Sequence, residues 1–298
     1  MALKLIVLVK QVPDTKNITA KAMKADGTVN RGELPAIYNP EDLNACEMAL
    51  DLRERYGGFI TVVTMGPPRA ADILRESLYR GVDRCVLLTD RAFAGADTLA
   101  TSYTLALAIR KAGEFDLVLC GRQAIDGDTA QIGPQVAEKL GINQITYVQR
   151  VRENAGREII LSRNLGRVAE TIKTRLPLLI TVTSSANQPR TFGAKLTMKY
   201  KKARTHMEIE RELNRRTASE DAVNRKYAEL DKRGLIIETW SAADLNADLG
   251  SIGLAGSPTK VKKVENIVFA TSKAKNIEPT EKGIRKLLDE LIEEHTFG

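Results

Sequence analysis

The chain has 298 residues, 43% of them hydrophobic and 28% charged, which is ordinary for a globular protein and excludes a low-complexity chain. It contains no run of about 18 apolar residues, so we expect no membrane span. The apolar stretch at its start is too short for a secretory signal peptide, and we therefore predict a cytoplasmic protein.

The net charge of +7 is concentrated in one segment. Residues 190–233 contain 13 Lys/Arg and 7 Asp/Glu, a local surplus of +6. A basic surface of this kind suits an acidic partner or nucleic acid. Because the segment has few aromatic residues for base stacking and no known nucleic-acid motif, we expect no nucleic-acid partner.

Cysteines and histidines are too few and too scattered for a metal site. The three cysteines, Cys46, Cys85 and Cys120, lie far apart in apolar segments, and we expect buried free thiols. The two histidines, His206 and His295, argue against a hydrolase triad. Paired carboxylates and a nucleophile elbow are also missing, so we predict no catalytic side chain and no metal.

Strands and helices alternate through the first half of the chain. Apolar runs predict strands over 3–9, 59–65, 84–88 and 117–120. Helices are predicted from Pro40, from about Pro68 to Arg80, from Asp97 or Thr98 to Ala112, and from about Thr129 to Leu140. Asn39 is expected to cap the first of these helices, with Glu41 and Asp42 in its first turn. This alternation indicates a doubly wound, mostly parallel α/β sheet with helices on both faces.

The pattern changes after Gly141. Strands are predicted over 145–151, 158–165, 168–174 and 178–183, and we expect them to extend the same sheet as an antiparallel meander. The polar passage 15–34 is predicted to form a small hairpin or an irregular loop, and residues 264–270 an extended segment. We place a nucleotide-binding α/β domain at 1–190 and a basic partner-recognition segment and C-terminal arm at 191–298.

The last hundred residues carry a weaker core signal. Residues 194–233 are charged and helix-prone with a weak apolar stripe, which favours an arm or docking helix over core. Thr280 is expected to cap a closing helix on which Ile284, Leu287, Leu288 and Leu291 share one face. Such a tail either wraps a partner subunit or packs on itself, and the sequence does not choose between the two.

The stretch from Leu117 to Pro134 holds the strongest candidate site. A strand ends there in a glycine-containing turn before a helix, where open α/β sheets bind nucleotides. Gly127 is expected to adopt positive φ or admit a phosphate, and Arg122 to offset phosphate charge. We assign Asp126 and Asp128 to capping or ribose hydroxyls. Neither a Walker A nor a Gly-x-Gly-x-x-Gly pattern is present, so these residues alone leave ligand binding open.

Several motifs in order resemble one family. Residues 121–126 read Gly-Arg-Gln-Ala-Ile-Asp and are followed by Asp128, Gln131 and Gly133. Together with Val9-Lys-Gln-Val-Pro13, Tyr38-Asn-Pro40, Met65-Gly-Pro67 and Leu176-Pro177, they resemble the nucleotide-binding signature of electron-transfer flavoprotein β subunits. The resemblance covers the chain to about Ala203 and resumes more loosely from Trp240.

This resemblance implies a heterodimer with an α subunit and an adenine-nucleotide-hydrolase-like fold without hydrolase activity. In the simple carriers of the family the β subunit binds AMP. In the electron-bifurcating branch it binds an FAD that accepts a hydride from NADH. One electron then goes to ferredoxin or flavodoxin and the other to the α-subunit FAD, which reduces an acyl-CoA dehydrogenase-like or other reductase partner.

The sequence leans toward the bifurcating branch. Gly127 and Thr129 stand where simple carriers usually have an acidic residue and a cysteine or similar group, and a missing carboxylate there would relieve repulsion with a pyrophosphate. Gly253–Thr259 also resembles a loop of the bifurcating members. The alternatives are a simple carrier with structural AMP and, in another class, a non-redox nucleotide-binding interaction protein with a basic tail.

Two sets of residues follow from the resemblance. The implied cofactor contacts are Val9, Asn39, Pro40, Glu41, Asp42, Met65, Gly121, Arg122, Gln123, Ala124, Ile125, Asp126, Gly127, Asp128, Thr129, Ala130, Gln131 and Ile132. The implied partner-recognition residues are Met198, Lys199, Lys201 and Lys202. Residues 205–234 look like an insertion beside this second set. The resemblance therefore leaves open whether the family's usual partner docks here.

Overall fold

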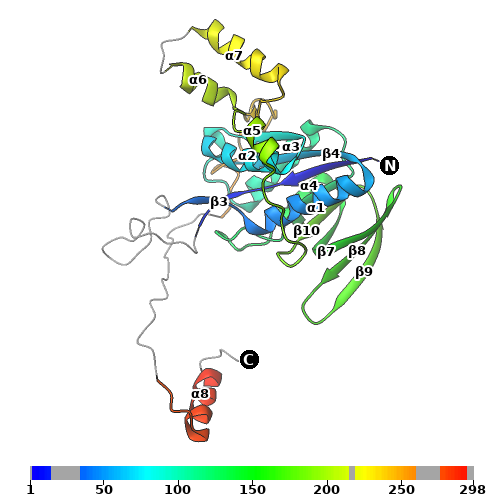
Figure 1. Ribbon diagram of the computed structural model, residues 1–298, viewed down its shortest axis with the longest axis vertical. Coiled ribbons are helices and arrows are strands. Elements are labelled where there is room, and N and C mark those ends of the chain that lie inside the picture. The colour runs from blue at the N-terminus through cyan, green and yellow to red at the C-terminus, as the bar shows by residue number, and fades with distance from the viewer. Residues whose placement is uncertain (1, 15–33, 215–218, 260–275, 294–298) are drawn as a thin grey trace.

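A nine-stranded sheet forms the centre of the chain in a computed structural model that describes residues 2–14, 34–214, 219–259 and 276–293 (Figure 1). The strand order is β11-β5-β4-β1-β6-β10-β7-β8-β9. The neighbours from β11 to β7 are parallel, and β7, β8 and β9 pair antiparallel. The predicted mixed α/β architecture with a mostly parallel sheet is confirmed.

The elements follow the predicted order closely. The strands are β1 (Leu3–Leu8), β2 (Gln11–Pro13), β3 (Ala36–Tyr38), β4 (Gly58–Met65), β5 (Arg84–Leu88), β6 (Leu117–Gly121), β7 (Asn143–Ala155), β8 (Glu158–Asn164), β9 (Ala169–Arg175), β10 (Leu178–Val182) and β11 (Glu238–Trp240). The helices are α1 (Pro40–Tyr56), α2 (Ala71–Arg80), α3 (Thr98–Ala112), α4 (Ile132–Leu140), α5 (Ala194–Tyr200), α6 (His206–Asn214), α7 (Glu220–Lys232) and α8 (Glu281–Glu293). Strands β2 and β3 form a separate antiparallel pair.

The direction of winding reverses beside β1. From β1 the chain proceeds outward through β4 to β5, and it then crosses to β6 on the other side of β1. Strand β10, predicted as the last strand of the meander, instead lies between β6 and β7 and is parallel to both. The reversal between β1 and β6 creates the crevice in which such sheets bind ligands.

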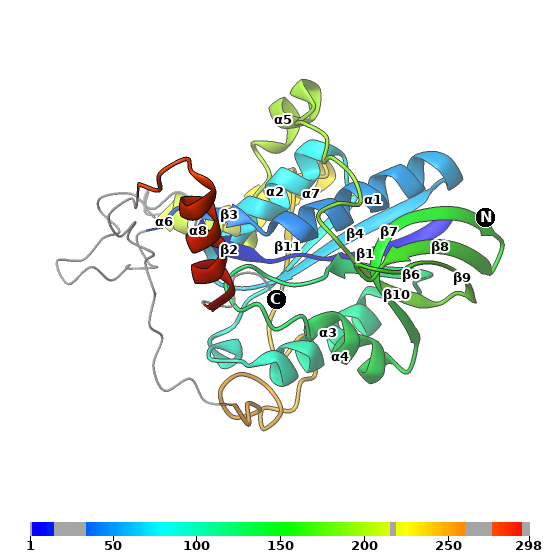
Figure 2. The ribbon, with the colours of Figure 1, turned by 90° about the horizontal axis from the view of Figure 1, so that it is seen from below.

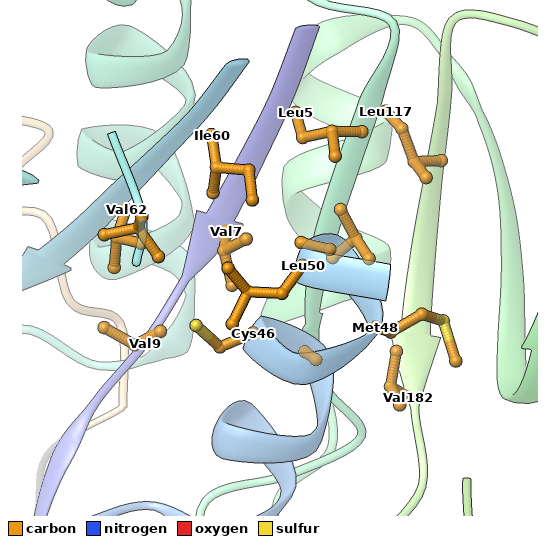
Figure 3. Packing of buried hydrophobic residues seen from close by; sticks show 14 of the residues in the cluster. Leu5, Val7, Val9, Cys46, Met48, Leu50, Ile60, Val62, Leu117 and Val182 are labelled. Carbon is orange, nitrogen blue, oxygen red and sulfur yellow. The ribbon is translucent and has the colours of Figure 1, made fainter. Parts of the chain in front are cut away.

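Two helix layers cover the sheet, with α1 and α2 on one face and α3 and α4 on the other (Figure 2). Strand β1 contributes to both interfaces: Leu5 and Val7, together with Val9 just after the strand, pack against α1 (Figure 3). Ile6 and Leu8 belong to the second buried cluster, with residues of α3 and α4. Burial on both faces explains why β1 is a continuous apolar run instead of an alternating one.

The three cysteines lie in the two buried interfaces between the sheet and the helices. Cys46 on α1, Cys85 on β5 and Cys120 on β6 are free and buried. The prediction of buried free thiols is confirmed. The expected hairpin or loop at 15–34 and the extended segment at 264–270 lie outside the described residues, apart from Leu34.

Helices α6 and α7 pack against each other, which differs from the expected arm with little core. Ile209, Val223, Leu230 and Leu235 form a small buried cluster of their own. Helix α6 begins with a reciprocal cap, because the Thr205 N–H donates to Glu208 and the Glu208 N–H donates to the Thr205 hydroxyl. The weak stripe on each helix suffices because the two stripes face each other.

The closing helix α8 presents its apolar face to the surroundings. The Gly283 N–H donates to the Thr280 hydroxyl at 3.1 Å, so the predicted cap is confirmed. Ile284, Leu288 and Ile292 are exposed, and none of residues 281–293 is buried. Figure 1 shows α8 apart from the sheet. In the described ranges, no helix is long and apolar enough to cross a bilayer.

Candidate functional site

A cavity of about 380 Å³ opens at the carboxyl ends of β1, β4 and β6, where the winding reverses. Its lining residues are Leu8, Val9, Lys10, Asp42, Met65, Phe93, Gly95, Ala96, Asp97, Thr98, Thr101, Leu105, Cys120, Gly121, Arg122, Gln123, Ala124, Gly127, Asp128, Thr129, Ala130, Gln131 and Ile132. Its position agrees with the rule that ligands of open α/β sheets bind at the topological switch point.

The cavity has apolar and polar parts with different origins. Leu8, Phe93, Leu105 and Cys120 also belong to the core between the sheet and α3 and α4. Much of the polar part comes from the loop between β6 and α4, residues 122–131, which brings backbone groups and side-chain amides. An apolar floor with a polar loop at one side suits a ligand that has a ring system and a charged group.

Asp42 joins the two strand ends that flank the crevice. Its carboxylate accepts the N–H of Lys10 after β1 at 2.9 Å and the N–H of Gly121 at the end of β6 at 2.9 Å. Burial raises the pKa of Asp42 to about 7, although the hydrogen bonds from Gly121, Asn39 and Lys10 favour the charged form. Asp42 therefore fixes the spacing of β1 and β6 from inside the protein.

Asn39 holds the loop after β6, and the prediction that its side chain caps α1 is wrong. Asn39 is the N-cap residue, but its amide donates to the Gln123 carbonyl at 2.9 Å and accepts the Ile125 N–H at 3.2 Å. Glu41 accepts the Gln123 N–H at 3.0 Å. Side chains at the amino terminus of α1 thus hold the loop through hydrogen bonds to the loop backbone.

Of the two alternatives predicted for Gly127, a positive φ or room for a phosphate, the first is not found. The residues with positive φ are Asp128 at 50° and Ala130 at 53°, whereas Gly127 is not among them. Among the described residues, no atom lies within 4 Å of the position that a Gly127 side chain would take. Gly127 therefore leaves open space beside the cavity, and the left-handed turns fall on two residues with side chains.

Three charged side chains of the loop have protein partners that the sequence did not reveal. Arg122 pairs with Glu41 at 3.2 Å, and its guanidinium lies 5.7 Å from the centre of the Tyr147 ring. Asp126 pairs with Lys10 at 2.7 Å. Asp128 accepts the Gln123 side-chain amide at 2.9 Å. The assignments of Arg122 to phosphate charge and of both aspartates to caps or ribose find no support in these contacts.

Helix α4 begins at Ile132, three residues after the first predicted position. Its N-cap residue is Gln131, whose side-chain oxygen accepts the Thr98 hydroxyl at 2.8 Å. The first N–H groups of a helix have no acceptor within the helix, and Ile132 lies in the cavity wall. The start of α4 therefore offers N–H donors at the polar side of the cavity.

The structure brings most of the expected cofactor contacts to this cavity. Those in its lining are Val9, Asp42, Met65, Gly121, Arg122, Gln123, Ala124, Gly127, Asp128, Thr129, Ala130, Gln131 and Ile132. Asn39, Pro40, Glu41, Ile125 and Asp126 are not in the lining. Asn39 and Glu41 act on the loop from behind.

Sequence reasoning missed a second segment of the wall, residues 93–101. Asp97 caps α3 by accepting the N–H groups of Leu99 and Ala100. The segment follows β5, so the rule that strand carboxyl ends share one edge of the sheet would have pointed to it. Lys10, also missed, lies inside a motif that the sequence had singled out.

The glycine-rich loop 253–259 packs behind this second segment. The Asp97 N–H donates to the Ser257 hydroxyl at 2.8 Å, and the Thr259 N–H donates to the Asp97 carboxylate at 3.1 Å. A side chain at Gly253 would lie 2.0 Å from the Ala92 carbonyl oxygen. Gly253 thus permits the close approach through which the loop supports the cavity wall.

The expected partner-recognition residues lie together on a different surface. Met198 and Lys199 are exposed on α5, and Lys201 and Lys202 follow it and are exposed too. Met198 is 62% accessible, and its sulfur accepts a hydrogen bond from the Lys201 ammonium at 3.5 Å. An apolar side chain among lysines is a surface to which an acidic partner can dock.

Comparisons with known proteins match nearly the whole chain. A family model described as "Electron transfer flavoprotein domain" matches residues 26–211. The chain is 42% identical over 259 residues to an electron transfer flavoprotein subunit beta of Clostridium acetobutylicum, covering 87% of this chain and 86% of that protein. It is 41% identical over 294 residues to the protein FixA of Bradyrhizobium diazoefficiens, covering 96% and 90%.

A third relative agrees with these two. The electron transfer flavoprotein subunit beta of Megasphaera elsdenii is 40% identical over 269 residues, which cover 88% of this chain and 87% of that protein. The family model spans more than half of the chain, and the relatives are matched over most of their own length. The chain therefore belongs to the electron-transfer flavoprotein β-subunit family.

Proposed function

We propose that this chain is the FAD-binding β subunit of an electron-bifurcating electron-transfer flavoprotein. The observation that carries the proposal is the cavity at the switch point, whose wall contains most of the residues that the family resemblance assigns to the nucleotide. When bound, this FAD would take a hydride from NADH and divide the electrons between ferredoxin or flavodoxin and the α-subunit FAD. The described chain supplies binding and orientation, and the cofactor supplies the redox chemistry.

The shape of the loop supports FAD as the ligand. Gly127 lies in the cavity wall with open space around it, and Thr129 follows two residues later. A carboxylate at either position would stand close to a pyrophosphate and repel it. The loop 253–259, which resembles one in the bifurcating members, contacts the opposite wall through Asp97.

The size of the cavity supports the alternative, a simple carrier that holds AMP. Small-molecule sites are ~300–1,000 Å³, so a cavity of about 380 Å³ suits an adenosine phosphate. If the ligand is FAD, its adenosine half would occupy the cavity. Its flavin ring would then lie outside the cavity, near a second subunit.

The partners follow from the same proposal. The relatives are named as β subunits, and we infer a heterodimer with an α subunit, in which the chain has the adenine-nucleotide-hydrolase-like fold. Residues 1–190 would form its nucleotide-binding domain, and 191–298 its recognition segment and an arm that covers the partner with the apolar face of α8. The surface around Met198 would dock an acyl-CoA dehydrogenase-like or other reductase. We keep the expectation of a cytoplasmic location.

Cofactor stoichiometry tests the proposal. The chain is purified together with its α subunit, and extracted nucleotides are separated by chromatography. We expect two FAD per heterodimer and bleaching of flavin absorbance by NADH. One FAD and one AMP would establish the simple carrier instead. A colourless heterodimer would point to a non-redox nucleotide-binding interaction protein.

A matched pair of variants separates charge from shape at the loop. Gly127→Asp should lower FAD content, because its carboxylate would repel the pyrophosphate. Gly127→Asn has nearly the same size without the charge and should retain FAD. Equal flavin content in the two variants would contradict a pyrophosphate beside position 127.

A further inference from the structure

We propose that Lys10 is the cation that binds a phosphate group of the nucleotide, and that Asp126 holds the Lys10 ammonium until that phosphate replaces it. The inference rests on the proposed function, because it needs a phosphate-bearing ligand in the cavity. It assigns a ligand contact to a side chain outside the set that the family resemblance implies.

The backbone of Lys10 is fixed by two hydrogen bonds, while its side chain is half exposed. Its N–H donates to Asp42 at 2.9 Å, and its carbonyl accepts the Asn39 N–H at 2.9 Å. The side chain lies in the cavity wall and is 47% exposed. Lys10 therefore has a constant base beside the cavity and an ammonium group on a long flexible stem.

The ammonium group is bound to the loop through Asp126. It lies 2.7 Å and 2.8 Å from the two carboxylate oxygens of Asp126, a residue 116 positions away in the chain. Asp126 is outside the cavity lining, whereas Lys10 is part of it. The carboxylate thus holds the ammonium group of a cavity-lining residue from outside the lining.

The other cation in the cavity wall is already engaged. Arg122 pairs with Glu41, whose side chain is only 9% exposed. The same carboxylate accepts the Gln123 N–H, so moving Arg122 away would leave Glu41 buried with one fewer partner. Among the lining residues that the structure describes, Lys10 is the cation whose partner is readily exchanged.

Each acidic residue of the lining accepts hydrogen bonds from groups other than the Lys10 ammonium. Asp42 and Asp97 accept backbone N–H groups, and Asp128 accepts the side-chain amide of Gln123. The ion pair is partly exposed, with 47% of the Lys10 side chain and 22% of the Asp126 side chain accessible, so solvent screens it and its net contribution to stability is small. A phosphate offers charge and several acceptor oxygens, so exchanging Asp126 for phosphate is favourable.

The experiment measures binding of AMP and of adenosine, which lacks the phosphate, to the nucleotide-free full-length chain by titration calorimetry. Lys10→Met keeps the length of the side chain and removes its charge. We expect it to weaken AMP about tenfold, ~1.4 kcal/mol, and to leave adenosine unchanged. Lys4→Met is the matched control, because Lys4 lies on β1, the strand that leads to Lys10, pairs with Glu114 at 2.6 Å and is outside the cavity lining.

A third variant tests the exchange itself. Asp126→Asn releases Lys10, and we expect AMP to bind at least as tightly as to the wild type. Equal loss of AMP and adenosine in Lys10→Met, or no loss of AMP, would overturn the phosphate contact. Weaker AMP binding by Asp126→Asn would overturn the exchange. If the wild type bound neither AMP nor FAD, the proposed function would fail with it.

Discussion

The carboxylate of Asp42 occupies the space that a side chain on Gly121 would need. An added Cβ at position 121 would lie 2.5 Å from Asp42 Oδ1 and 2.7 Å from the Asp42 backbone nitrogen. Only a residue without a Cβ allows the two backbones to approach this closely. The approach lets the Gly121 N–H donate its hydrogen bond to Asp42. The junction of β6 with its loop depends on this close approach.

Gly121→Ala should disturb the junction. Because backbone atoms of α1 would have to move, we expect the free energy of unfolding to fall by ~1–3 kcal/mol and the bound nucleotide to decrease. Urea unfolding and nucleotide extraction measure the two effects. Gly127→Ala is the control, since its methyl group would meet no described atom within 4 Å, and it should change stability by less than ~0.5 kcal/mol.

Asn39→Ala tests whether the α1 amino terminus supports the loop. The variant loses the bonds to Gln123 and Ile125 and leaves a partly buried carbonyl and a partly buried N–H without these partners. We expect a loss of ~1–3 kcal/mol in unfolding free energy and weaker nucleotide binding. Asn39→Asp, which keeps the acceptor for Ile125, should be affected less. Faster hydrogen exchange in α1 but not at Ile125 would contradict this account and favour a simple cap.

Asp42 predicts a pH dependence of stability. Burial raises its pKa to about 7, above the ~3.9 of an unfolded aspartate. Between these values the folded chain binds more protons than the unfolded chain, so this contribution to stability is full at low pH and is lost as the pH rises through 7. We expect the wild type to lose about 2 kcal/mol relative to Asp42→Asn between pH 5 and 8. Urea unfolding at each pH measures the free energies. The same change with pH in both proteins would contradict the assignment of this pH dependence to Asp42.

The lysines near Met198 predict salt-dependent partner binding. Replacing Lys199, Lys201 and Lys202 with Glu should slow reduction of the downstream partner about tenfold at low salt, because charge complementarity mainly affects association rates. Stopped-flow measurements at several ionic strengths should show the difference shrink with salt. Reversal of Lys226 and Lys232 on α7 and of Arg233 at its C-cap is the control for net charge. Equal slowing by both triple variants would place recognition elsewhere.

Local patterns predicted the elements well because each signal lies within its own segment. The apolar run of β6 and Gly141 at the end of α4 are examples: Gly141 has φ 69°, as a helix-ending glycine requires. The switch-point rule then indicated the site, since the alternation of strands and helices identifies a doubly wound sheet, in which ligands bind at the carboxyl ends of the strands. These predictions needed no knowledge of long-range contacts.

Long-range pairing is where the predictions were wrong. Asn39 is a residue type typical of helix N-caps, yet its side-chain amide donates a hydrogen bond to the carbonyl of Gln123, 84 residues away. Arg122 and Asp126 pair with Glu41 and Lys10 for the same reason. The position of β10 between β6 and β7 also depends on strand pairing. No local sequence pattern indicates which distant residue each of these side chains contacts in the fold.

The three buried thiols offer a way to observe motion in this fold. Burial raises the pKa of Cys46 to about 11 and raises those of Cys85 and Cys120 as well. Since the thiolate is the reactive form, none of them should react with an alkylating reagent while its own element stays closed. Labelling rates at the three positions would thus report separately how often α1, β5 and β6 open, and added nucleotide should protect Cys120, the one in the cavity wall.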